Sequence, residues 1–276
     1  MSLFRKLFGL SSKPSAEAES SAAHSPEIPD GDSAAEAANQ AANQAAREAS
    51  AACLDRHWQG VGAVEQDVLG YLISPSFTGG PQWPSTRQAY RVVRRGESIL
   101  LATDGLSDPF DDAEGMGNGF EMELFLETAD IPEHARGKPG EVDPLKYSWA
   151  FELLQHVAGT VAGAGGIVGQ IEQHGVLSLE LPGVSQSQHI GEQLTAHFVS
   201  DDDTVGVLLG GPPADFPTRL DDMPLSPVSL IAVVLITASE LDYVRAGGRA
   251  AREELVQRLQ AAGVGHRSDL QRASVV

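Results

Sequence analysis

The run VSLIAVVLIT at residues 228–237 constrains the fold more than any other part of the chain. It is apolar and rich in β-branched side chains, as expected of a strand that is covered on both faces and lies inside a sheet. Its ten residues are too few to cross a bilayer, which takes about 20 residues in a helix. The sequence thus predicts a central β-strand rather than a membrane span.

A second strand is predicted at residues 120–127, where apolar and polar side chains alternate. Phe120 and every second residue after it point to one face, while Glu121, Glu123 and Phe125 point to the other. One face must belong to the core, and the other is expected to meet solvent or a partner. Shorter strands are expected at residues 90–93, 99–103, 176–181 and 204–209.

Helices are expected mainly late in the chain. Residues 147–161 have helical periodicity, with Ser148 as the N-cap. After the central strand, Ser239 and Asp242 are expected to cap a short helix, and residues 249–262 to form a second one. Paired strands followed by helices predict an α+β fold, with a mixed, mostly antiparallel sheet and helices packed on one face.

The beginning of the chain has a different composition from the rest. Residues 11–36 are rich in Ser, Ala, Glu and Pro, and they predict a disordered N-terminal tail because they cannot bury enough apolar area to fold. An Ala-rich helix is expected from Ser33 onward. We therefore expect residues 1–57 to be a tail with a helical part and residues 58–276 to be the folded domain.

The first ten residues, MSLFRKLFGL, leave two interpretations open. They can be a frayed terminus, or a short amphipathic anchor that docks weakly to a membrane or a partner. They are too short for stable membrane insertion. With the second interpretation, the protein would be a tethered adaptor.

The chain is acidic, with 38 Asp and Glu against 19 Lys and Arg. The excess lies in the middle, because residues 97–243 hold 25 acids against 4 bases. Such a surface repels the phosphates of nucleic acids and of anionic membranes, so neither is an expected partner. A basic protein is the expected partner.

The sequence contains none of the common catalytic or cofactor motifs. Its one cysteine, Cys53, excludes an intrachain disulfide, and the eight histidines lack metal-ligand spacing. No nucleophile elbow or P-loop is present, and the glycines at residues 163–169 follow a helix instead of opening one. We therefore expect a cytoplasmic protein that is not an enzyme and has no catalytic residue, metal or cofactor.

Carboxylates are concentrated at residues 104–114. The cluster consists of Asp104, Asp108, Asp111, Asp112 and Glu114. It does not match the calcium-loop pattern. Three interpretations stay open, namely a solvated loop, a protein-binding surface, and the site of a metal-dependent or hydrolytic enzyme.

Four motifs between residues 90 and 272 resemble the Suppressor of fused family in order and spacing. The residues that carry the resemblance are Gly105, Leu106, Ser107 and Asp108 (similar to G-L-S-D), Gly119 and Phe120 (the start of a G-F-E-L-like strand), Trp149 (W-x-x-E-L), and the run at 228–237 with the S-E-L turn after it. Each motif is short, but their common order is specific.

The resemblance implies an α+β domain that binds protein and is not an enzyme. Animal members have a second lobe and clasp a peptide of a transcription factor, partly by strand addition. We expect this chain to lack that lobe, because it ends where the lobe would begin. Bacterial single-lobe members are regarded as immunity proteins that neutralise a partner in toxin systems, and the Ala-rich tail is typical of a bacterial protein.

The sequence and the resemblance together predict a protein that sequesters or neutralises a basic partner. The residues expected to steer this partner are Asp108, Asp111, Asp112 and Glu114. Glu121, Glu123 and Phe125 are expected to contact it if their strand face is open.

Overall fold

The computed structural model describes residues 31–71, 73–110 and 117–276, and residues 39–276 form one compact unit. The tail predicted at residues 11–36 lies mostly outside these ranges. The described strands are β1 (Ala63–Val64), β2 (Leu69–Gly70), β3 (Ala89–Arg95), β4 (Ser98–Asp104), β5 (Met122–Thr128), β6 (Leu177–Pro182), β7 (Thr204–Leu209), β8 (Arg219–Leu220) and β9 (Val228–Ile236).

The described α-helices are α1 (Gly31–Val61), α2 (Glu133–Arg136), α3 (Trp149–Gly163), α4 (Val168–His174), α5 (Gln188–Gln193) and α6 (Ala238–Ala261). Short 3₁₀ helices are η1 (Pro75–Thr78), η2 (Asp143–Tyr147), η3 (Val184–Gln186) and η4 (Ala196–Phe198). No helix within the described ranges is long and apolar enough to cross a membrane.

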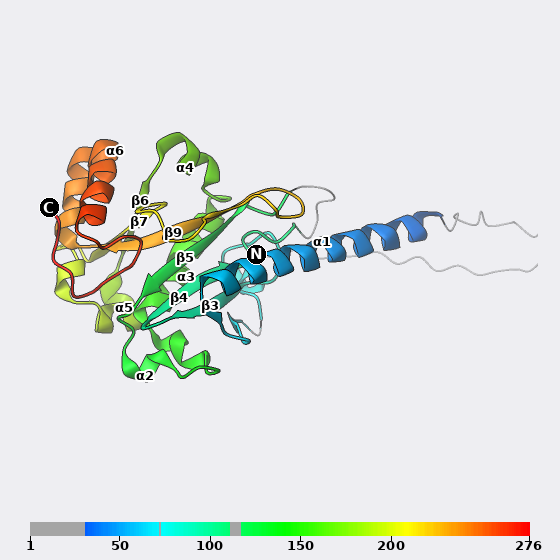
Figure 1. The fold of residues 1–276 in the computed structure, drawn as a ribbon, viewed down its shortest axis with the longest axis horizontal. Helices are drawn as coiled ribbons and strands as arrows, with labels where there is room; N and C mark the ends of the chain where they lie inside the picture. Colours follow the sequence, from blue (N-terminus) through cyan, green and yellow to red (C-terminus); the bar gives the residue numbers. More distant parts are fainter. Residues whose placement is uncertain (1–30, 72, 111–116) are drawn as a thin grey trace, which may run out of the picture. The chain divides into compact units, whose positions relative to one another are not determined.

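The strands form one sheet in the order β1-β3-β4-β5-β9-β7-β6, with β2 paired to β3 and β8 paired to β9. Strand β9 lies in the interior between β5 and β7 (Figure 1), and all of its residues except Ser229 are buried. It runs parallel to β5, whereas the other pairs of named strands are antiparallel. The central strand and the mixed, mostly antiparallel α+β fold are thus confirmed.

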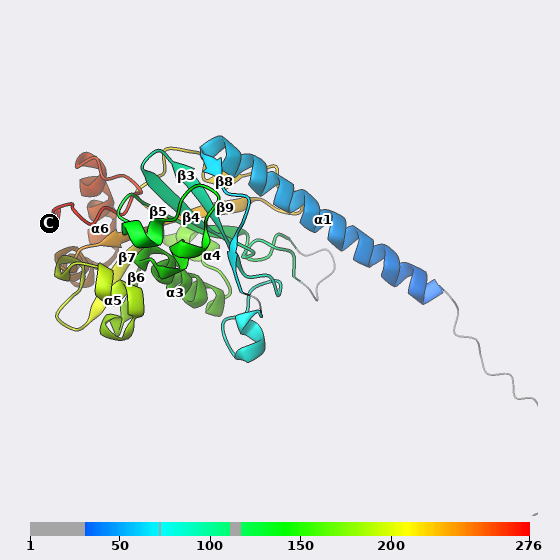
Figure 2. The ribbon, with the colours of Figure 1, turned by 90° about the horizontal axis from the view of Figure 1, so that it is seen from below.

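Helices cover both faces of the sheet, so the expectation of helices on one face is wrong. On one face, α3 packs through Leu153 and Val157 against the side chains of Leu124 and its neighbours. On the other face lie Trp58 from α1 and Leu255 from α6. Figure 2 shows α3 and the C-terminal end of α1 on opposite sides of the sheet. The physical reason is the two-sided apolar pattern of β9, which is buried only if both faces are covered.

The helix starts follow local capping chemistry. Ser148 caps α3, as predicted, because its hydroxyl accepts a hydrogen bond from the Phe151 N–H. Helix α6 begins earlier than predicted, with Thr237 and Glu240 forming the capping box in place of Ser239 and Asp242. Gly248, with a φ of 59° and a ψ of −133°, is not helical and divides α6 into two helical segments, so both predicted helices are present.

The first described helix bears on where the folded domain begins. Helix α1 runs through residue 57, and both Leu54 and Trp58 are buried in one hydrophobic cluster with Phe125. The predicted bounds, 1–57 and 58–276, therefore divide a continuous helix.

Candidate functional site

The loop after β4 contains the first family-like motif, and its shape depends on a glycine. Gly105 has a φ of 144°, and a Cβ there would lie 2.6 Å from the Arg87 carbonyl oxygen. A side chain at this position would therefore collide with the neighbouring backbone. Leu106 points into the core and is fully buried. The next residue, Ser107, turns its N–H and hydroxyl toward β5.

The partner of Ser107 is the carboxylate of Glu123, which is fully buried on β5. Its Oε1 accepts hydrogen bonds from the Gly105 N–H (3.1 Å), the Ser107 N–H (2.8 Å) and the Ser107 hydroxyl (2.6 Å). Burial and the neighbouring Asp104 raise the pKa of Glu123 to about 7. The hydrogen bonds from Ser107 and Thr103 favour the ionised form and lower the pKa, but their effect is smaller. Glu123 thus holds the loop in place from inside the protein.

Two acids of the predicted cluster are paired with arginines from β3 and the segment before it. Asp104 is buried and contacts Arg87 and also Arg91, whose Nε lies 3.0 Å from Asp104 Oδ2. Asp108 accepts a hydrogen bond from the Ser85 hydroxyl (2.8 Å) and lies 3.3 Å from Arg87. Asp108 is 15% exposed. Asp111, Asp112 and Glu114 lie outside the described residues.

The face of β5 that was predicted to bind a partner, if open, is closed. Phe125 is fully buried and makes edge contacts with Trp58 and His266. Glu123 is buried by the loop described above. Neither side chain is accessible to a partner in this structure. Trp58 of α1 and His266 of the C-terminal segment cover Phe125, and the loop after β4 covers Glu123. Glu121 is exposed at the start of the strand, with a φ of 56°.

The remaining motif residues are also structural. Gly119 has a φ of 52°, and a Cβ there would lie 2.4 Å from the Asp108 carbonyl oxygen. The Phe120 N–H donates to the Leu106 carbonyl oxygen at 2.8 Å, which joins the first two motifs. Trp149 is fully buried, and its indole N–H donates to the Asp130 carbonyl oxygen at 2.9 Å. These residues build the fold rather than a surface.

A second buried carboxylate, Glu127, ties the C-terminal segment to the sheet. It contacts Arg95, the Ser98 hydroxyl and His266, whose Nε2 lies 2.8 Å from Glu127 Oε2. Burial alone would raise the pKa of Glu127, but the hydrogen bonds from His266, Ser98 and Arg95 lower it to about 2. The group is therefore ionised and fully partnered.

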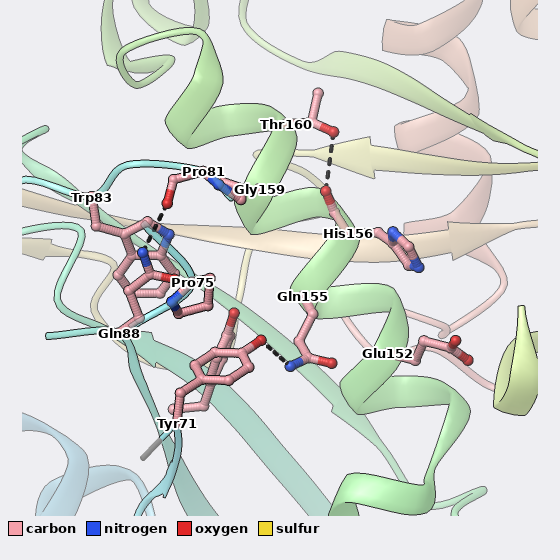
Figure 3. A pocket seen from close by; sticks show the side chains of 11 residues that line it. Tyr71, Pro75, Pro81, Trp83, Gln88, Glu152, Gln155, His156, Gly159 and Thr160 are labelled. Atoms are coloured by element: carbon pink, nitrogen blue, oxygen red, sulfur yellow. Dashed lines mark hydrogen bonds between the residues drawn. The ribbon is translucent and has the colours of Figure 1, made fainter. Parts of the chain in front are cut away.

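A hollow on the surface lies between α3 and the segment that consists of Tyr71 and residues 73–83. It has a volume of about 530 Å³, and its walls include Tyr71, Trp83 and His156. Figure 3 shows Tyr71 and Gln155 meeting across this groove, where the Gln155 amide donates to the Tyr71 hydroxyl. Sequence analysis did not identify this groove.

Exposed apolar side chains are concentrated at residues 68–77. Of seven large hydrophobic side chains exposed in the described part of the chain, four fall within ten residues, namely Val68, Tyr71, Ile73 and Phe77. Soluble domains seldom expose such a group without a function. The signal in the sequence was a run of apolar residues and prolines without a helical or strand period.

The hollows around this groove have an acidic lining. One next to Val68 is lined by Asp67, Glu141 and Asp143, and one beyond α3 shares Glu152 with the groove. No Lys or Arg lines any of these three hollows. Among the described residues, no group of three or more His, Cys, Asp or Glu is placed to hold a metal ion.

These observations define a class of protein: an α+β domain with structural buried carboxylates and a surface groove next to exposed apolar side chains and an acidic hollow. The family comparison gives the particular family. The model described as Suppressor of fused protein (SUFU) matches residues 94–273, and the chain belongs to this family. The resemblance seen in the four sequence motifs is thus confirmed.

Two solved structures are similar to the chain. One is described as the Sufu-Fu complex crystal structure, with 19% identity and a TM-score of 0.47, covering 76% of this chain and 85% of that chain. The other is the crystal structure of Drosophila Suppressor of Fused, with 16% identity and a TM-score of 0.40, covering 77% of this chain and 42% of that chain. A comparison with curated proteins gives no match.

Proposed function

We propose that this chain is a cytoplasmic protein-binding domain that is not an enzyme and that sequesters or neutralises a basic partner protein. The observation that carries the proposal is membership of the Suppressor of fused family over residues 94–273, nearly the same stretch that holds the acidic excess. Complementary charge speeds the encounter with such a partner and selects it. A role as a bacterial immunity protein, which neutralises a toxin, fits this proposal.

The proposed steering residues are Asp108, Asp111, Asp112 and Glu114, and the exposed Glu121 is a proposed contact residue. A direct test combines Asp111→Lys with Asp112→Lys and measures capture of the partner from the native cell. The matched control combines Glu192→Lys with Asp201→Lys, two exposed acids elsewhere. We expect the first variant to lose the partner and the control to keep it. If both variants capture the partner equally well, the acidic loop is not the binding surface.

The immunity role has its own test. Co-expression with the product of a neighbouring reading frame that is toxic on its own should restore growth. Growth that stays arrested, with the complex absent from the same cells, contradicts the immunity role.

A further inference from the structure

We propose that the groove between residues 71–83 and α3 is a docking site for a peptide segment of the partner that carries a large apolar side chain close to a lysine or arginine. This inference rests on the proposed function, because it names where a protein partner binds and by what chemistry. It concerns a different surface from the acidic loop at residues 104–114.

The first support is the concentration of exposed apolar surface beside the groove. Phe77 is 71% exposed and Ile73 is 69% exposed. Trp83 lines both the groove and a smaller adjoining hollow that also contains Phe77. An apolar side chain of a peptide can therefore pack against Tyr71 and Trp83, with Phe77 exposed in the adjoining hollow.

The second support is hydrogen-bonding capacity on the groove walls. The His156 ring and the Trp83 indole N–H have no hydrogen-bond partner within the described part of the chain. The Gln155 amide uses its N–H on Tyr71, which leaves its oxygen as an acceptor. An extended peptide needs such donors and acceptors, because its backbone must remain hydrogen-bonded when it leaves water.

The third support is charge. Asp67 and Glu141 line the hollow beside Val68 together with Asp143, which is already paired with Lys146 at 2.7 Å. Within the described residues, neither Asp67 nor Glu141 has a salt-bridge partner. The groove has no Lys or Arg in its lining, and the carboxylate of Glu152 is held by the backbone N–H groups of residues 188–190. A cationic side chain therefore complements the surface, whereas an anionic one is repelled.

The apolar and acidic parts are close enough for one short segment. Val68 lines the acidic hollow and Tyr71 lines the groove. The chain between them passes through β2, where each residue of a strand spans about 3.3 Å, so their Cα atoms are at most roughly 10 Å apart. A basic side chain about three residues from the apolar anchor would reach both parts.

A random peptide library selected on the full-length protein tests this directly. We expect the selected peptides to combine an aromatic residue or leucine with lysine or arginine, and to bind the Phe77→Ser and Tyr71→Ser variants at least about tenfold more weakly. Leu225→Ser is the control, because Leu225 lies outside the groove and is exposed about as much as Tyr71 (41% against 44%). Selected peptides without basic residues, or with equal affinity for the groove variants, overturn the inference.

The three tryptophans provide a site-specific readout with internal controls. A selected peptide should shift the NMR resonance of the Trp83 indole N–H and leave those of Trp58 and Trp149 unchanged, because these two side chains are fully buried elsewhere. The double variant with Asp67→Lys and Glu141→Lys should bind roughly tenfold more weakly. No shift at Trp83, or an equal shift at all three, contradicts docking in the groove.

The same variants separate this inference from the proposed function. If the native partner is still captured by Tyr71→Ser and Phe77→Ser but is lost with the acidic-loop variant, the groove inference fails and the proposed function stands. If the groove variants only abolish self-association of the protein, measured by light scattering, the occupant is a second copy and the peptide inference fails.

Discussion

Ser107 donates two hydrogen bonds to one oxygen of Glu123, from its N–H at 2.8 Å and from its hydroxyl at 2.6 Å. This pair joins the loop after β4 to the strand β5, which are the sites of the first two family-like motifs. The contact explains why small and polar residues occur there, because a larger residue than Gly105 would displace the loop from the carboxylate. The motif at residues 105–108 thus has a structural role, because it fixes the loop around the buried carboxylate of Glu123.

The first prediction concerns the pH dependence of the free energy of unfolding that results from Glu123. The pKa of Glu123 is raised from 4.5 to about 7, so its folded form binds a proton more tightly than its unfolded form. Its contribution to stability is present below pH 4.5 and is lost as the pH rises through 7. The loss amounts to at most about 3.5 kcal/mol, since one pKa unit corresponds to about 1.4 kcal/mol.

Glu123→Gln should remove this dependence. Its oxygen can keep the bonds from Ser107, and its amide can donate to the Thr103 hydroxyl. Urea denaturation between about pH 5 and 8 should show a flatter curve for this variant than for the wild type. Glu121→Gln, at the exposed neighbouring acid, is the control and should follow the wild type. Identical slopes for all three proteins would rule out the assignment to Glu123.

The second prediction has the opposite sign and concerns Glu127. Its pKa is lowered from 4.5 to about 2, so its contribution to stability is present above pH 4.5 and is lost as the pH falls toward 2. Glu127→Gln leaves the buried His266 and Arg95 without their carboxylate and should reduce the free energy of unfolding at pH 7 by about 3 kcal/mol. Thermal denaturation measures this change. The control, Glu97→Gln on the exposed turn, should leave the free energy of unfolding unchanged. If Glu127→Gln also leaves it unchanged, the assigned network around Glu127 is wrong.

The third prediction uses a pair of glycines. Gly119→Ala places a Cβ 2.4 Å from the Asp108 carbonyl oxygen at a φ of 52°, and should destabilise the fold by more than about 1 kcal/mol. Gly163→Ala, in α3 with nothing within 4 Å of its Cβ, should instead stabilise it by a few tenths of a kcal/mol to about 1 kcal/mol. Chemical denaturation of both variants compares them. Equal effects would show that backbone geometry at Gly119 is not the cause.

The sequence predicted the six longer strands because their apolar patterns are clear, but it did not predict the two-residue strands β1, β2 and β8. The bounds of β7 were predicted correctly, and β9 was recognised as central from its apolar run. That same run implied cover on both faces of the sheet, which conflicts with helices on one face. The prediction that helices pack on one face was based on the order of the helices along the chain. That order does not reveal which face of the sheet a helix covers.

The acidic cluster was harder to interpret because pairing across the sheet is not visible in sequence. Asp104 and Asp108 were counted in the acidic middle of the chain, but their partners Arg87 and Arg91 belong to the preceding segment. The groove was missed for a related reason. Residues 71–83 have no period, and only the arrangement beside α3 brings Tyr71 and Trp83 together.

The fourth prediction bears on where the folded domain begins. Leu54 is 2% exposed and belongs to the hydrophobic cluster that contains Trp58 and Phe125. Leu54→Ala removes buried methyl groups and should reduce the free energy of unfolding by about 2 to 5 kcal/mol. Urea denaturation measures the loss, with Leu225→Ala as the exposed control. If Leu54→Ala is as neutral as the control, the domain begins at residue 58 as the sequence predicted. A large loss means that the C-terminal part of α1 is needed to close the face of the sheet that holds Phe125.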